Sequence, residues 1–153
     1  MRSNTAAQPS SRRSTVTKLA ALAAAALILT GYMMHMRAPG DIDYSRTRMS
    51  EAGIYRGTIR PQTDPIPQGR LHSWTLNLET ASGEAVDSAS IAVDGGMPQH
   101  GHGLPTKPVV TRYAGNGDYV VEGMKFNMGG WWVVKFRVSS PAGTDSLLFN
   151  IKL

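Results

Sequence analysis

Residues 131–153 read WWVVKFRVSSPAGTDSLLFNIKL, and this stretch decides the fold class. Apolar side chains alternate with polar ones in Trp132-Val134-Phe136-Val138 and again in Leu147-Phe149-Ile151-Leu153. A period of two is typical of strands with one buried and one solvated face. Between the two runs, Ser140-Pro141-Ala142-Gly143-Thr144 supplies turn residues. The end of the chain is therefore predicted to be a pair of adjacent strands joined by a tight turn.

The same pattern extends back towards Gly53, as short β-branched and aromatic segments separated by Gly, Pro, Asn and Asp. Gly115-Asn116-Gly117 supplies the positive-φ residues that a tight hairpin needs. The predicted strands cover residues 54–60, 72–79, 88–93, 109–113, 118–123, 131–138 and 146–153. About seven short strands in roughly 100 residues predict an all-β, immunoglobulin-like antiparallel sandwich over residues 53–153.

One N-terminal hydrophobic helix is expected before this domain. Residues 19–36 read LAALAAAALILTGYMMHM without a charge, after a polar and basic segment at residues 1–18. As a helix this run reaches ~27 Å, close to the ~30 Å hydrocarbon core of a bilayer. A basic approach followed by an apolar run is typical of an export signal, with a buried soluble helix as the alternative. No small-x-small cleavage site follows the run, so an uncleaved transmembrane signal anchor is predicted, followed by a linker at residues 37–52.

The orientation of this anchor rests on the export-signal pattern. Four basic residues precede the apolar run and three follow it, so the charge bias alone hardly decides. The export pattern favours the N-terminus inside and the domain outside the cytoplasm.

Charge and cysteine content exclude several classes of function. Residues 1–37 hold five basic and no acidic residues, which leaves eleven of each sign in residues 38–153. A neutral domain lacks the basic face that a nucleic-acid binder needs, so no nucleic acid is expected as a partner. Because the chain has no cysteine, it can form no disulfide, lipoprotein anchor, zinc–thiolate site or blue-copper centre.

Two short glycine-rich segments carry the candidate functional residues. Met97, His100 and His102 lie in Gly95–Gly103, and Met124 and Met128 lie in Met124–Gly130. Imidazole and thioether together are the ligand set that suits Cu(I). His100 and His102 are two residues apart, which puts both imidazoles on one side of an extended segment.

The order of the predicted strands brings these two segments to one end of the sandwich. If strand 88–93 ends at the top, strand 109–113 runs down and strand 118–123 returns to the top. Met97, His100, His102, Met124 and Met128 are then predicted to share that end as a possible Cu(I) site, with no other cofactor expected.

Other interpretations of the same residues remain open. Methionine is usually a core filler, and the two histidines could lie in a surface loop and bond backbone carbonyls. Alternatively, Trp131, Trp132 and the loop 94–108 could form a contact surface for a membrane or envelope partner. Catalysis is not predicted, because the carboxylates are scattered and several stand at turns, where Asp is favoured for backbone reasons.

Three motifs together resemble the YtkA-like/FixH-like domain family over about residues 85–153. The motifs are Met97-Pro98-Gln99-His100-Gly101-His102-Gly103-Leu104-Pro105-Thr106, Gly117-Asp118-Tyr119, and Gly123-Met124-Lys125-Phe126-Asn127-Met128-Gly129-Gly130-Trp131-Trp132. The YtkA-like branch fits the loop motif more closely than the FixH-like branch.

This resemblance carries expectations about place and function. It implies a small bacterial envelope protein, held in the inner membrane by one N-terminal span, with an all-β domain facing the periplasm or cell exterior. FixH-like members are associated with maturation of copper-containing respiratory oxidases. Carried over, the resemblance makes Met97, His100, His102, Met124 and Met128 candidate copper contacts.

Overall fold

The computed structural model describes residues 40–153, which belong to one compact unit, Ala38–Leu153. The predicted basic segment 1–18 and signal anchor 19–36 lie outside the described residues. Within residues 40–153, no helix has both the length and the apolar character needed to cross a bilayer.

The described residues form an all-β structure of nine strands. In chain order the strands are β1 (Thr47–Met49), β2 (Tyr55–Pro61), β3 (His72–Thr80), β4 (Ser90–Met97), β5 (His102–Gly103), β6 (Val109–Gly115), β7 (Asp118–Met124), β8 (Trp131–Ser140) and β9 (Gly143–Lys152). All seven strands predicted from the sequence are present. The two additional ones, β1 and β5, are too short to show a hydrophobic period, and β1 lies inside the segment predicted as linker.

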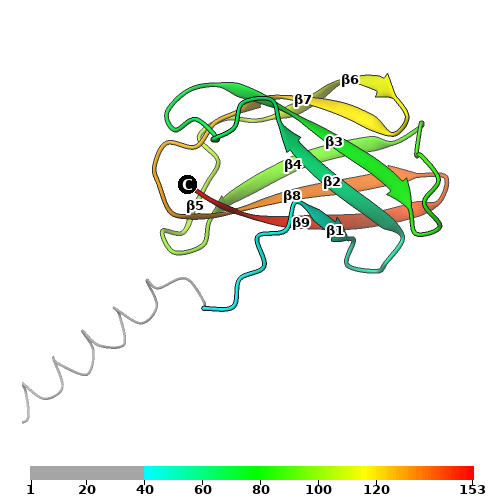
Figure 1. The fold of residues 1–153 in the computed structure, drawn as a ribbon, viewed down its shortest axis with the longest axis horizontal. Helices are drawn as coiled ribbons and strands as arrows, with labels where there is room; N and C mark the ends of the chain where they lie inside the picture. The colour runs from blue at the N-terminus through cyan, green and yellow to red at the C-terminus, as the bar shows by residue number, and fades with distance from the viewer. Residues whose placement is uncertain (1–39) are drawn as a thin grey trace, which may run out of the picture. The chain divides into compact units, whose positions relative to one another are not determined.

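All strand pairs between named elements are antiparallel, and the strand order is β1-β2-β3-β7-β6-β4-β8-β9, with β5 added to β4. Figure 1 shows two layers, with β2, β3, β7 and β6 facing β4, β8 and β9. A single residue pair, Ala92 with Val109, joins the layers at one side, and β1 and β2 contact β9 at the other. The predicted antiparallel β architecture is therefore confirmed at this level, but the layers belong to one curled, nearly barrel-like sheet.

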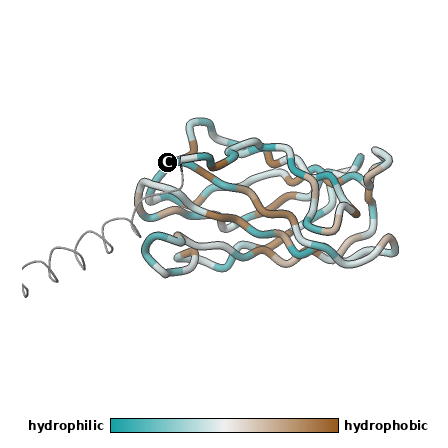
Figure 2. Tube along the Cα trace, turned by 90° about the horizontal axis from the view of Figure 1, so that it is seen from below, coloured by the Kyte–Doolittle hydropathy of each residue, from teal (hydrophilic) through white to brown (hydrophobic). Residues whose placement is uncertain are grey.

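The core lies between these layers and follows the alternation seen in the sequence. Figure 2 shows hydrophobic and hydrophilic positions alternating along the strands. The largest fully buried side chains are Trp74, Trp132, Tyr55, Phe126, Phe136, Phe149, Ile59, Leu76, Leu78, Met124, Leu147 and Val121. Since burial of each large apolar side chain contributes about 1.5–3 kcal/mol, this core stabilises a domain that has no disulfide.

Asp145 joins the start of β9 to the turn between β1 and β2. Its carboxylate accepts hydrogen bonds from the backbone amides of Ala52 at 3.0 Å and Ile54 at 3.3 Å, and it is 8% exposed. Burial acts to raise the pKa of Asp145, but hydrogen bonds from the Ser50 hydroxyl and from backbone amides hold this pKa below the usual 3.8. This carboxylate therefore has a structural role, at the start of β9.

Candidate functional site

The two His/Met segments meet at one end of the domain, as the strand directions predict. The Thr106 hydroxyl donates a hydrogen bond of 2.6 Å to the carbonyl of Gly123, which joins the loop before β6 to the end of β7. A Cβ added at Gly130 would lie only 2.4 Å from Cε of Met97. The segment after β7 therefore packs directly against the end of β4.

A tight hairpin between β4 and β5 positions the first group of candidate ligands. Met97 is the register partner of His102, and the backbone amides of His100 and Gly101 both donate to the Met97 carbonyl at 3.0 Å. Gly96 is required here, because a Cβ at this position would lie 2.6 Å from the carbonyl oxygen of His102. Gly96 thus allows β4 and β5 to approach closely.

Both loop imidazoles are exposed and lie beside each other. The rings of His100 and His102 are stacked, with centroids 5.9 Å apart and an interplanar angle of 28°. Nδ1 of His102 lies 3.1 Å from the carbonyl oxygen of Gly103. Because a carbonyl can only accept, this contact favours the proton on Nδ1, and in the neutral ring the lone pair then lies on Nε2.

The ring of Trp132 packs against the ring of His102. The two rings meet edge to face, with centroids 5.5 Å apart, and the indole N–H donates to the carbonyl of Met128 at 3.1 Å. Trp132 thus contacts residues from both loops. The side chain of Trp132 is fully buried, and the alternative prediction of a contact surface for a partner stays a prediction. Trp131 is partly buried, and its N–H donates to Asn150.

The two remaining candidate ligands of these loops, Met97 and Met128, differ in burial. Met97 is only 2% exposed, but together with His102 it lines a cavity of about 350 Å³. The other lining residues are Asp94, Gly95, Gly96, Pro98, Gly101, Gly103, Val133 and Lys135. Met128 is 36% exposed. We call Met97, His100, His102 and Met128 the rim site.

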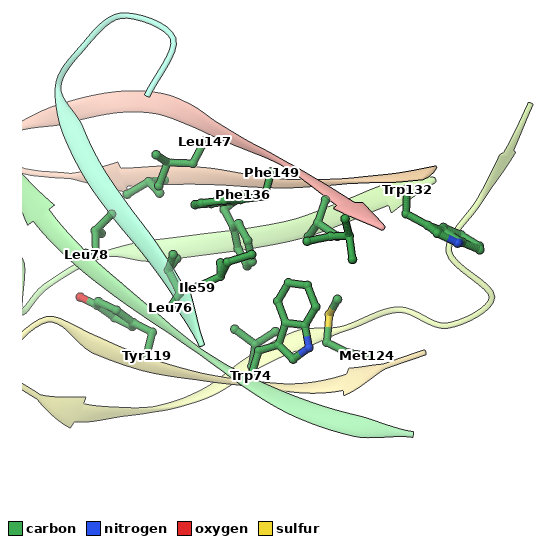
Figure 3. Close-up of a cluster of buried hydrophobic side chains, with 14 of the residues drawn as sticks. Ile59, Trp74, Leu76, Leu78, Tyr119, Met124, Trp132, Phe136, Leu147 and Phe149 are labelled. Atoms are coloured by element: carbon green, nitrogen blue, oxygen red, sulfur yellow. The ribbon is translucent and has the colours of Figure 1, made fainter. Parts of the chain in front are cut away.

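Met124 occupies a different position from the other four predicted ligands. Its side chain is fully buried, and its register partner is His72, the first residue of β3. Figure 3 shows the side chains of Met124 and Trp74 directed into the interior between the strands. The structure therefore places Met124 in the core, next to a histidine to which the sequence assigns no function.

The described residues contain no group of three or more His, Asp or Glu side chains placed to hold one metal ion. The rim site belongs to a different ligand class, imidazole with thioether, which suits soft ions. Sequence reasoning missed the contact between Trp132 and His102 and the pairing of His72 with Met124. The alternation in β8 correctly indicates that Trp132 points inward, but no sequence signal pairs His72 with Met124.

Comparison with protein families agrees with this architecture. The model of the YtkA-like family matches residues 51–137, more than half of the chain and nearly all of the segment from β2 to β8. The chain therefore belongs to the YtkA-like family. The match starts and ends earlier than the predicted resemblance at residues 85–153. The FixH-like part of that predicted resemblance stays a prediction. Neither the curated proteins nor the solved structures include a significant match to the chain.

Proposed function

We propose that this YtkA-like protein is a membrane-tethered envelope protein that binds Cu(I) at the rim site, either to hold the ion or to pass it on. The proposal rests on the stacked imidazoles of His100 and His102 and on Met97 as the register partner of His102. The Trp132 ring contacts His102 and its N–H donates to the Met128 carbonyl, which brings the second methionine-bearing loop beside them. The site has a binding role, and no catalytic step is assigned to it.

The chemistry of the rim site favours a soft, singly charged ion. Neutral imidazole and thioether groups are the ligands expected for Cu(I), whereas carboxylates and carbonyls suit harder cations. The contact between Nδ1 of His102 and the carbonyl of Gly103 fits a metal ligand that binds through Nε2, with the carbonyl as its outer partner. Met128 and the two histidines are accessible from solvent, so an ion could enter and leave without unfolding of the domain.

The proposed location rests on the family and on the N-terminal sequence. The YtkA-like domain suggests a small extracytoplasmic protein. The uncharged run at residues 19–36 is proposed to anchor it in a bacterial inner membrane, with the β domain facing the periplasm or cell exterior. Membrane fractionation tests this tether: the full chain should sediment with membranes after alkaline carbonate washing, and release into the supernatant would contradict it.

A competition titration with a chromogenic Cu(I) chelator tests the rim site under anaerobic conditions. The full chain should bind Cu(I), and the double variant His100→Ala/His102→Ala should bind it at least about tenfold more weakly, or 1.4 kcal/mol. Met128→Leu should also weaken binding, because it removes the thioether while keeping most of the side-chain volume. Met49→Leu is the matched control, since Met49 is an exposed methionine on β1. Equal affinities for the full chain and the double histidine variant would refute the proposal.

A further inference from the structure

His72 is a buried histidine with an unused ring nitrogen. It is 9% exposed, and its Nδ1 lies 3.1 Å from the carbonyl oxygen of Arg70. Because that carbonyl can only accept, the contact requires the proton on Nδ1. In the neutral ring, Nε2 then carries the lone pair, and this buried atom has no hydrogen-bond partner among residues 40–153. A buried polar atom without a partner is uncommon and requires an explanation.

The residue opposite His72 carries a second soft donor. Met124 in β7 is the register partner of His72 in β3, and directly opposite residues have Cβ atoms about 4.5–5.5 Å apart. The ladder shifts register between His72 and Trp74, where β7 contains Gly123 at φ +81°. Since both His72 and Met124 are buried, their side chains occupy the same interior region at the end of this strand pair.

Aromatic rings surround this pair. The imidazole of His72 lies 6.2 Å from the ring of Trp74 and 5.7 Å from the ring of Phe126, measured between centroids. The faces of such rings attract cations. Nε1 of Trp74 also has no hydrogen-bond partner in the described part of the chain. A water molecule that accepts from Trp74 and donates to His72 is therefore the main competing occupant.

The lack of a carboxylate beside His72, among the residues that the structure describes, favours a singly charged cation over a divalent one. Asp145 is the single buried carboxylate within residues 40–153, and it is held by backbone amides at the start of β9. A buried ion beside His72 would meet only neutral donors, so desolvation disfavours a divalent cation far more than a singly charged one. One imidazole nitrogen and one thioether sulfur suit the soft ions Cu(I) and Ag(I).

A separate opening leads to His72. A cavity of about 350 Å³ contains this histidine in its wall, together with Gln62, Thr63, Pro67, Arg70, Leu71 and Ser73. No residue of this wall lines the cavity at the rim site. The connection before β3 also packs against the segment after β7, because the amide of Gly69 donates to the carbonyl of Phe126 at 2.7 Å. An ion could therefore reach His72 without passing the rim site.

We propose that Nε2 of His72 and the sulfur of Met124 form a second, buried site for a singly charged soft metal ion, Cu(I) or Ag(I). This site is independent of the rim site and stands even if the rim site binds nothing. Its two ligands come from adjacent strands of the core, so occupancy links β3 to β7 and stabilises the fold by mass action.

The test uses Ag(I), which does not change oxidation state, and a full-length variant without the exposed ligands of the rim site, His100→Ala/His102→Ala/Met128→Leu. Added Ag(I) should shift the Nε2 resonance of His72 and the methyl resonance of Met124 in NMR spectra. Further replacement by Met124→Leu should weaken Ag(I) binding at least about tenfold, because it removes the sulfur while conserving apolar volume.

Unchanged His72 and Met124 resonances in excess Ag(I) would overturn the proposal. Equal Ag(I) affinity with and without Met124→Leu would also overturn it. Thermal unfolding of the metal-free Met124→Leu variant controls for misfolding. A rim site that binds no metal ion is recognised separately. In the wild-type chain, Ag(I) would then leave the His100 and His102 resonances unchanged.

Discussion

Gly130→Ala tests whether the segment after β7 packs against Met97 as the structure shows. Gly130 has φ +124°, a conformation that residues with a Cβ rarely adopt, and the new methyl group would lie 2.4 Å from Cε of Met97. The backbone conformation costs about 1–3 kcal/mol. The Met97 methyl group is the flexible end of its side chain, so it can move to a normal contact distance of ~3.5–4.0 Å. This movement costs a further ~0.5–1.5 kcal/mol, the energy of a side chain displaced from its preferred rotamer.

Gly130→Ala is therefore expected to destabilise the domain by about 1.5–4.5 kcal/mol. Met97→Ala alone should cost about 2–5 kcal/mol, because it removes a buried methionine side chain. The double variant should cost less than the sum of the two, by roughly 0.5–1.5 kcal/mol, because without Met97 the new methyl group contacts nothing at 2.4 Å. The size of this coupling isolates the contact from the backbone strain.

Urea unfolding of residues 38–153, followed by tryptophan fluorescence, measures these four free energies. Strictly additive costs for Gly130→Ala and Met97→Ala would refute the contact between the two loops. A cost below about 0.5 kcal/mol for Gly130→Ala would refute the strained conformation of Gly130. Gly40→Ala is the matched control, because its added Cβ meets no atom within 4 Å among the described residues.

Three further predictions concern parts of the fold that position the site. Asp145→Asn should lower stability by about 1.5–3 kcal/mol at neutral pH. Since the pKa of Asp145 is depressed in the folded state, the stability difference between wild type and Asp145→Asn is fully present above pH 3.8. It is lost as the pH falls through the pKa of the folded state, and urea unfolding at a series of pH values measures this loss. Tyr55→Phe removes the hydroxyl that donates to the Gly143 carbonyl at 2.6 Å, and calorimetry should show a loss of about 1–2 kcal/mol. Trp132→Phe removes the N–H bonded to Met128 at 3.1 Å, so amide exchange in residues 125–130 should accelerate while the β8–β9 ladder stays protected; equal protection in that segment would contradict its anchoring role.

Much of the strand pattern was predictable because it is local. In β8 and β9, the alternation of Trp132, Val134 and Phe136 with polar neighbours indicates which face is buried, whatever the strand packs against. The shared position of the two loops followed from the number of strands between them, since each antiparallel strand reverses the chain direction. The short strands β1 and β5 were not predictable, because three and two residues contain no measurable period.

The burial of the candidate ligands was less predictable. Met97, Met124 and Met128 look alike in the sequence, yet their side chains are 2%, 0% and 36% exposed. The difference arises from where β4 and β7 end relative to the neighbouring strands. Methionine fits both a core and a ligand role, so residue type alone does not separate them.

By itself, the sequence determined the β class, the neutral charge of the domain, the lack of cysteine and the meeting of two His/Met loops. Only the tertiary structure decided that Trp132 contacts His102 and that His72 lies opposite Met124. The physical reason is that a period of two records which side of a strand is buried, but every antiparallel ladder uses the same backbone hydrogen bonds. Which strands become neighbours, such as β3 and β7, is settled by packing between residues far apart in the chain.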